Sequence, residues 1–208
     1  MGKNENIHSG LVWYKRIALE IVWGLCFVIG CSPRWFRFGV LLPFFSFLLR
    51  AVRYRKSTVI ENLTKSFPEK SEKELNRICK DFYKNITEQI INTISQSGVS
   101  DKTLQHRMKL IDTEKTREEI GDRSAIMLTA HFGPWEAGST ASLAFPDQTF
   151  VAVYHKLTNV VMDELMKRIR RHKNVELVDM KRTMRHFVDN RNKRPMAMGL
   201  IADQNPVL

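Results

Sequence analysis

The chain has 208 residues, 43% of them hydrophobic and 26% charged, so it can bury one sizeable core and is not wholly disordered. Its net charge of +11 is concentrated at the two ends, because residues 1–56 hold 9 basic against 2 acidic side chains and residues 150–208 hold 12 against 6. Three cysteines without C-x-x-C spacing, Cys26, Cys31 and Cys79, argue against a zinc ribbon and a secreted disulfide framework and favour a reducing compartment.

Two apolar runs occupy the N-terminal part of the chain, at residues 17–32 and 38–49. Each is shorter than the roughly 20 residues of a membrane-spanning helix. A cleaved signal peptide is disfavoured, because no small-residue cleavage site follows and apolar sequence soon resumes. A soluble helical hairpin and a membrane anchor, either dipping into or crossing the bilayer, remain as alternatives.

The anchor is favoured by aromatic residues of the kind found at membrane interfaces. They are Trp13, Tyr14, Trp23 and Trp35. A basic cluster follows the second run, at Arg50, Arg53, Arg55 and Lys56. On this interpretation the cluster faces an anionic membrane surface on the cytoplasmic side, and residues 1–56 form a hydrophobic membrane-anchoring helical region.

An amphipathic helix is predicted from Ser71 onward. Ser71 and Glu74 have the spacing of a capping box. Apolar residues then recur at the spacing of one helix face, at Leu75, Ile78, Phe82, Ile86, Ile90 and Ile94. The pattern predicts a core-packing helix that ends near Gly98, with no chemistry of its own.

Residues 124–201 alternate between short apolar runs and helical patterns. Strands are predicted at 125–129, 149–154, 175–178 and 195–201, the first of them buried on both faces. Helices are predicted around 159–172 and around Met184, Phe187 and Val188. This order is typical of βαβ units, so residues 57–208 are expected to form an α/β domain with a mainly parallel sheet and flanking helices.

The chemically informative stretch is Leu128–Glu136, LTAHFGPWE. His131 is placed where the first predicted strand ends, which is where open α/β sheets collect catalytic groups. On one helix, side chains five residues apart diverge by about 140°, but a turn at Gly133-Pro134 can bring His131 and Glu136 together. Such a pair makes an oriented general base. The alternative is that His131 is an ordinary hydrogen-bonded loop residue.

The motif HFGPWE resembles the His-x4-acidic motif of glycerolipid-type acyltransferases, in the form found in the bacterial lipid A biosynthesis (lauroyl/myristoyl) late acyltransferase family. Other segments agree in order with that family: Tyr54-Arg55, Asn62-Leu63, Phe67-Pro68, residues 82–85, residues 151–170 and residues 202–206. The resemblance runs from about residue 11 to the end of the chain.

This resemblance implies a glycerolipid acyltransferase-like fold and acyl transfer without a covalent enzyme intermediate, a metal or another cofactor. His131 would be the base, Glu136 its orienting partner, and backbone N–H groups near Gly133 donors to the oxyanion. Substrate-binding positions implied by the same motifs are Gly133, Trp135, His155, Lys156, Asp203 and Gln204.

The implied partners are acyl carrier protein as donor and a lipid A precursor as acceptor, at the cytoplasmic face of a Gram-negative inner membrane. Both partners are acidic and suit a basic cluster at Lys167, Arg168, Arg170, Arg171 and Lys173, whose alternative is a solvated helix face. Coenzyme A as donor, and a lysophospholipid or aminolipid as acceptor, remain alternatives. No nucleic-acid partner is expected, because no helix-turn-helix, zinc-finger or RNA-binding signature is present.

Two departures from the family pattern stand out. Tyr154-His155 occupies a position where many members have Tyr-Arg, so that His155 or Lys156 would have to substitute. The chain also stops where the family continues, so it is expected to be truncated at its C-terminus, and an inactive membrane-bound fragment is a further alternative.

Overall fold

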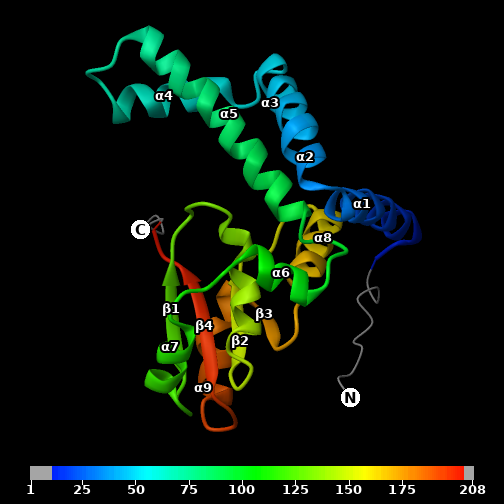
Figure 1. Ribbon diagram of the computed structural model, residues 1–208, viewed down its shortest axis with the longest axis vertical. Coiled ribbons are helices and arrows are strands. Elements are labelled where there is room, and N and C mark those ends of the chain that lie inside the picture. Colours follow the sequence, from blue (N-terminus) through cyan, green and yellow to red (C-terminus); the bar gives the residue numbers. More distant parts are fainter. Residues whose placement is uncertain (1–10, 204–208) are drawn as a thin grey trace.

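The computed structural model describes residues 11–203. At its centre is a sheet of four parallel strands: β1 (Ala125–Thr129), β2 (Thr149–Tyr154), β3 (Val175–Asp179) and β4 (Met196–Ile201). Their order across the sheet is β1-β4-β2-β3 (Figure 1). The four predicted strands and the parallel α/β fold are therefore confirmed, with the ends of β3 and β4 shifted by one residue.

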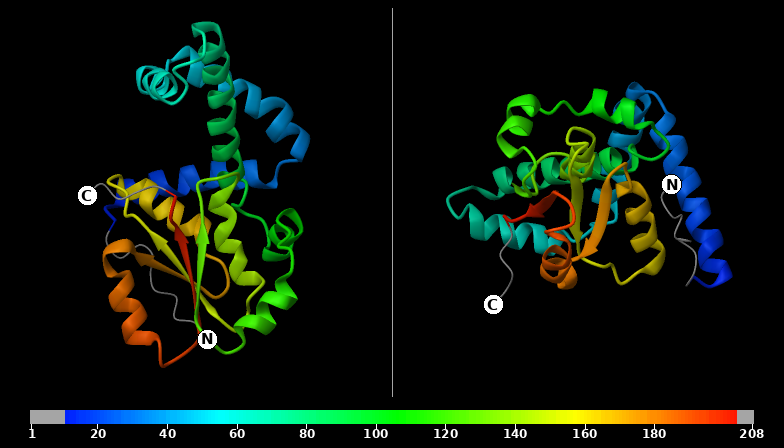
Figure 2. Two further views of the ribbon diagram at one scale, coloured as in Figure 1. Left: turned by 90° about the vertical axis from the view of Figure 1, so that its left-hand side faces the viewer. Right: turned by 90° about the horizontal axis from the view of Figure 1, so that it is seen from below.

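The two faces of the sheet are covered by different helices (Figure 2). Helix α9 (Thr183–Asn190), which follows the 3-10 turn η3 (Met180–Arg182), packs on one face. The 3-10 helix η2 (Trp135–Leu143) packs on the other, next to α6 (Asp101–Arg107), while α7 (Thr113–Ile120) leads into β1. Alternating residues of β4 enter the two cores, since Met196 and Met198 face α9 whereas Ala197 packs with Phe150 and Ala141.

Strand β1 lies at the edge of the described sheet, and here the sequence-based prediction was wrong. Ile126 is 59% exposed and Leu128 70% exposed, although the apolar run predicted a strand buried on both faces. The reason is the strand order: within residues 11–203, β1 pairs with β4 alone, at the edge of the sheet away from β3. A continuous apolar run therefore does not by itself distinguish a central strand from an edge strand.

The N-terminal half of the described chain is helical. Its elements are α1 (Trp13–Cys31), α2 (Arg34–Phe36), the π-helical turn η1 (Arg37–Leu41), α3 (Leu42–Ala51), α4 (Lys56–Ser66) and α5 (Glu72–Ile94). Helix α1 packs on α8 (Val160–Arg170), burying Leu19 and Cys26 against Leu165 and Ile169. Helices α3, α4 and the first part of α5 form an arm that extends away from the sheet (Figure 1).

The predicted capping box at the start of α5 is confirmed, with Ser71 and Glu74 bonded reciprocally. The predicted core face is shifted, because the buried row of α5 runs through Leu75, Cys79, Tyr83, Thr87 and Ile91, and Ile90 is 48% exposed. The cause is that α3 and α4 both pack on the helix, so the residues between them, Cys79 and Tyr83, are buried against Leu49 and Val59.

The two apolar runs at the N-terminus lie in α1 and in the helical segment Arg34–Ala51. Within residues 11–203, no single helix has both the length and the apolar character needed to cross a membrane. By those two criteria α1 combined with the segment Arg34–Ala51 passes, but the two parts are bent by 112°.

Candidate active site

The candidate site lies at the carboxyl ends of β1 and β4, and their register creates it. Thr129 is paired with Ile201, and the Ala202 N–H donates to the Thr129 carbonyl at 3.0 Å. Residues two positions further along adjacent parallel strands point to the same side. His131 and Asp203 are therefore brought face to face, although 72 positions separate them in the sequence.

Asp203 binds His131 through both of its carboxylate oxygens. The His131 backbone N–H donates to Oδ2 at 2.9 Å, and the imidazole Nδ1 lies 2.8 Å from Oδ1. These bonds, the backbone one first, hold the pKa of Asp203 below its usual range. Because a carboxylate only accepts hydrogen bonds, the neutral imidazole carries its proton on Nδ1, which leaves the lone pair on Nε2 available.

Trp135 packs against the imidazole of His131. Its ring meets the His131 ring edge-on, with centroids 4.9 Å apart and an interplanar angle of 70°. The imidazole is thus held by a carboxylate at Nδ1 and by an aromatic ring beside it, with one third of the side chain still exposed. A histidine fixed in one tautomer and open at Nε2 can accept a proton from a neighbouring hydroxyl.

Glu136 is bonded to Arg170 rather than to His131. The guanidinium of Arg170, at the end of α8, donates from Nε to Oε2 at 2.7 Å and from Nη2 to Oε1 at 2.6 Å. Both side chains are largely buried, 12% and 18% exposed. The turn after β1 does bring Glu136 toward the site, but the carboxylate at hydrogen-bond distance from His131 belongs to Asp203.

A cavity of about 710 Å³ lies along the sheet beside these two pairs, within the ~300–1,000 Å³ common for ligand pockets. His131, Trp135, Glu136 and Arg170 all contribute to its wall. The rest of the wall is mainly apolar and comes from the sheet, from η2 and α8, and from the segment after α6. It includes Met108, Leu110, Met127, Phe150, Ala152, Met162, Met166 and Ile201.

The floor of this cavity depends on a glycine in β4. A Cβ added to Gly199 would lie 2.8 Å from the ring of Phe150, which is itself 5% exposed. Only a residue without a side chain allows this ring and the strand to approach so closely. The resulting space is mainly apolar and has His131 in its wall, which suits a bound hydrocarbon chain.

The family model for bacterial lipid A biosynthesis acyltransferases matches residues 13–207 of the chain. The chain belongs to this family. A comparison with curated protein sequences found no significant match. As a member of the family it is an acyltransferase of lipid A biosynthesis.

The other site residues predicted from the acyltransferase motifs differ in whether they line the cavity. Gly133 adopts a left-handed φ of 59° in the turn before η2, and the Trp135 N–H donates to its carbonyl at 2.9 Å. His155 lines the cavity, whereas Lys156 is exposed and does not line it. Gln204 lies outside the described residues.

Arg170 is the site residue that the sequence did not single out. It was predicted only as one of five cations facing an acidic partner, and the structure pairs three of those within the chain: Lys167 with Asp163 and Glu164, Arg168 with Glu20, and Arg170 with Glu136. Arg171 and Lys173 have no ion pair within residues 11–203. The signal that could have identified Arg170 is its position at the end of the helix that follows β2.

Within residues 11–203, no group of three or more His, Cys, Asp or Glu side chains is arranged to hold a metal ion. The expectation that catalysis requires neither a metal nor another cofactor stays a prediction.

Proposed function

We propose that the chain transfers a fatty acyl group from acyl carrier protein to a hydroxyl of a lipid A precursor, with His131 as general base. The observation that carries this proposal is the His131–Asp203 pair, whose imidazole lines the 710 Å³ apolar cavity, in a chain of the lipid A acyltransferase family. The apolar wall would hold the acyl chain. The acceptor hydroxyl would meet the thioester end of that chain beside His131.

The reaction on this proposal has one base and no covalent enzyme intermediate. His131 Nε2 takes the proton of the acceptor hydroxyl while the hydroxyl oxygen attacks the thioester carbonyl carbon. The tetrahedral intermediate then expels the carrier thiolate, the C–S bond breaks, and the imidazolium returns its proton to sulfur. Asp203 would stabilise the imidazolium, because a carboxylate at Nδ1 favours the charged ring.

Glu136 enters the mechanism through Arg170. A bidentate carboxylate fixes the guanidinium in one orientation, and Arg170 lines the same cavity as His131. We propose that the held cation stabilises the oxyanion, together with backbone N–H groups near Gly133. Direct orientation of His131 by Glu136 would require Glu136 to leave Arg170 when substrate binds, and the two schemes predict different variant kinetics.

Binding of the acidic donor is proposed to involve cations without a partner inside the described chain. Arg171 and Lys173 follow α8 and have no ion pair within residues 11–203, and Lys156 is exposed beyond β2. Since acyl carrier protein is acidic, these residues would raise its rate of encounter and make that rate sensitive to salt.

We further propose that α1 and α3 contact the cytoplasmic face of the inner membrane. Each helix exposes large apolar side chains on the side not packed on the protein. On α1 these are Trp13, Ile17, Ile21, Leu25 and Val28, and on α3 they are Phe44, Phe47 and Leu48. Apolar stripes of this size are favourable when buried in the interfacial region of a bilayer, where the lipid acceptor is also found.

An acyl-transfer assay with membrane fractions tests the proposal. Labelled acyl carrier protein and a tetra-acylated lipid A precursor are supplied to the unmodified chain and to His131→Ala. Transfer by the former, reduced by about 10²- to 10⁴-fold in the variant, is expected for loss of a general base. Transfer to lysophospholipid alone would overturn the acceptor, and turnover unaffected by His131→Ala would overturn the base. Absence of any turnover by the unmodified chain would contradict the proposed activity.

A further inference from the structure

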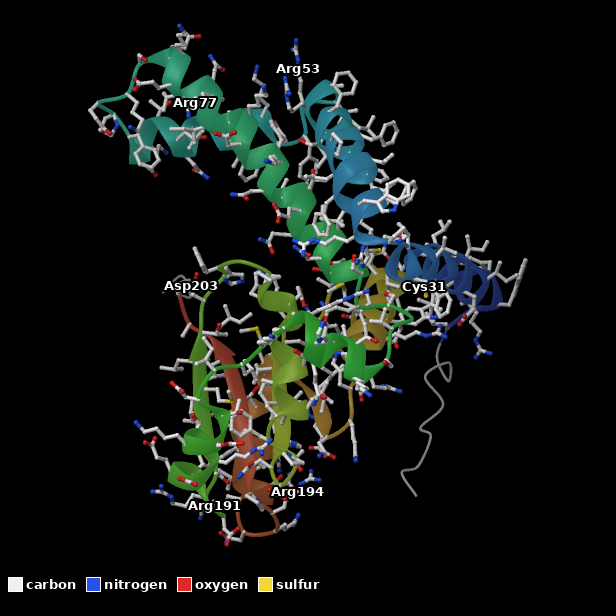
Figure 3. The ribbon with its side chains drawn as sticks, in the orientation of Figure 1. Cys31, Arg53, Arg77, Arg191, Arg194 and Asp203 are labelled. Atoms are coloured by element: carbon white, nitrogen blue, oxygen red, sulfur yellow. The ribbon has the colours of Figure 1, made fainter. Side chains whose placement is uncertain are left out.

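A second cavity, of about 390 Å³, lies in the helical arm, far from the acyl-transfer site. It is formed where the end of α3, the turn before α4, and α5 meet. Figure 3 shows Arg53 and Arg77 at this end of the molecule and Asp203 beside the sheet. The two cavities therefore serve separate sites.

Four cations surround the arm cavity: Arg50, Arg53, Lys56 and Lys80. The remaining wall consists of Phe47, Ala51, Asn76, Cys79 and Tyr83, so it contains no carboxylate. Within residues 11–203, none of the four cations has an ion pair, whereas neighbouring Lys65 and Lys70 are paired with Glu61 and Glu69. Converging cations without an internal partner produce a positive potential that an external anion would neutralise.

The cavity is built on a backbone that the fold holds in an unfavourable conformation. Arg53 and Arg55 are non-glycine residues with left-handed φ angles of 52° and 49°. The phenol of Tyr83, 3% exposed, donates to the Tyr54 carbonyl between them at 2.9 Å. Non-glycine residues keep left-handed backbone angles only where the surrounding structure holds them, and such strained turns are common at ligand sites. Here α5 fixes the turn that presents Arg53.

An apolar surface continues directly from the rim of the arm cavity. Phe47 lines the cavity and is also 66% exposed. On α3 it lies beside Phe44 and Leu48, which are 58% and 42% exposed, and the spacing places all three on one helix face. An anion attached to an apolar body, as the phosphate of a membrane lipid is, would contact the cavity and this apolar face together.

We infer that the arm cavity binds the phosphate headgroup of an anionic membrane lipid, with the acyl tails along the exposed face of α3. This discrete site goes further than a general attraction between a basic region and a membrane. It rests on the proposal that α1 and α3 contact the bilayer, but not on the assignment of His131. Aspartate and glutamate are absent from the wall, so the phosphate would be bound by cations and by the Asn76 amide.

Vesicle flotation of the full chain tests the site. The probes are phosphatidylcholine vesicles and vesicles in which part of the phosphatidylcholine is replaced by phosphatidylglycerol. The variant Arg50→Gln/Lys80→Gln removes two cations from the cavity. Its matched control, Lys73→Gln/Arg77→Gln, removes two cations from the same arm that do not line the cavity. We expect the cavity variant to bind phosphatidylglycerol vesicles about tenfold more weakly than the control variant.

Equal weakening of vesicle binding by both double variants would mean that the attraction comes from non-specific charge. That result would overturn the site but leave membrane contact by α1 and α3 intact. Failure of the unmodified chain to bind either type of vesicle would overturn the membrane contact as well. The charge-conserving variant Arg50→Lys/Lys80→Arg should keep the binding, and circular dichroism shows that the compared proteins are folded. Loss of binding in this variant with folding intact would also contradict the inference, because the charge would be unchanged.

Two other sources of the anion are separated by further arms of the experiment. Inorganic phosphate at constant ionic strength should leave flotation unchanged, because the lipid phosphate is anchored by its tails; displacement would make the cavity a site for soluble phosphate. If the cavity variant lost acyl transfer from carrier protein in detergent but floated normally, the cavity would belong to an acidic protein instead. Either result would overturn the lipid assignment.

Discussion

The sheet region and the helical arm each contain a cavity, and they treat charge in opposite ways. Beside the sheet, His131 is bonded to Asp203 and Arg170 to Glu136 within the fold. In the arm, the cations around the smaller cavity have no carboxylate in its wall. Charges paired within the fold are fixed in place and suit chemistry, which needs preorganised groups. Unpaired cations suit recognition, because their partner arrives with the ligand.

Changing Asp203 is the strongest test of the proposed catalytic role of the paired charges beside the sheet. In Asp203→Asn the amide NH₂ can donate to Nδ1, which favours the tautomer with the proton on Nε2 and blocks that nitrogen as a base. We expect the rate of acyl transfer to fall by about 10²- to 10⁴-fold. The matched control is Glu176→Gln, which alters a carboxylate that lies 3.1 Å from His186 and also pairs with Arg194, away from the cavity. Comparable losses of acyl-transfer rate in both variants would mean that the His131–Asp203 pair has a structural role.

A second experiment separates the two roles possible for Glu136. Arg170→Lys keeps the charge but loses the bidentate geometry, and we expect about a 10²-fold fall in kcat. If Glu136 acts through Arg170, then adding Glu136→Gln to Arg170→Lys should cost little more, because the two residues act as a unit.

The contrary result would be additive losses in the double variant. Additivity would mean that Glu136 contributes independently of Arg170, as it would if it turned to His131 during the reaction. The assay is the same acyl transfer from carrier protein, with single and double variants compared at saturating acceptor.

Much of the fold could be predicted from the sequence, because strand and helix periods are local. The four strands, α8 and the capping box of α5 each depend on residues within one segment. What the sequence lacks is the order of the strands. The parallel pairing of β1 with β4 places Asp203 beside His131, and without it the nearest carboxylate along the chain, Glu136, was the natural candidate.

The same limit explains the errors in burial. Leu128 is as apolar as a central strand requires, but β1 is paired on one edge within the described residues. Ile90 fits the helical repeat, yet the two helices that pack on α5 leave it half exposed. Both outcomes depend on neighbours that are distant in the sequence. Local pattern predicts elements, and tertiary contacts decide which faces they bury.

The junction between the two regions offers a matched pair of stability variants in α1. A Cβ on Gly30 would lie 1.9 Å from the Ser97 carbonyl oxygen after α5, whereas a Cβ on Gly24 would meet nothing within 4 Å. Gly30→Ala should lower the free energy of unfolding by about 1–3 kcal/mol through overpacking. Gly24→Ala should raise it by up to about 1 kcal/mol through helix propensity. Urea denaturation checks both, and equal stabilities would contradict the close contact.

The smallest effect concerns a second His–Asp pair in the sheet region. His172 is almost fully buried, its side chain 5% exposed, with Nδ1 3.4 Å from Asp101. Burial lowers the pKa of His172 and outweighs the opposing attraction of Asp101. The unfolded chain therefore binds more protons below the ordinary pKa of about 6.5, and the free energy of unfolding should fall as the pH drops below it.

In His172→Gln this part of the decline should be absent, while the other histidines contribute equally to both proteins. Parallel curves for the two proteins between about pH 7 and 5 would mean that His172 titrates as in water.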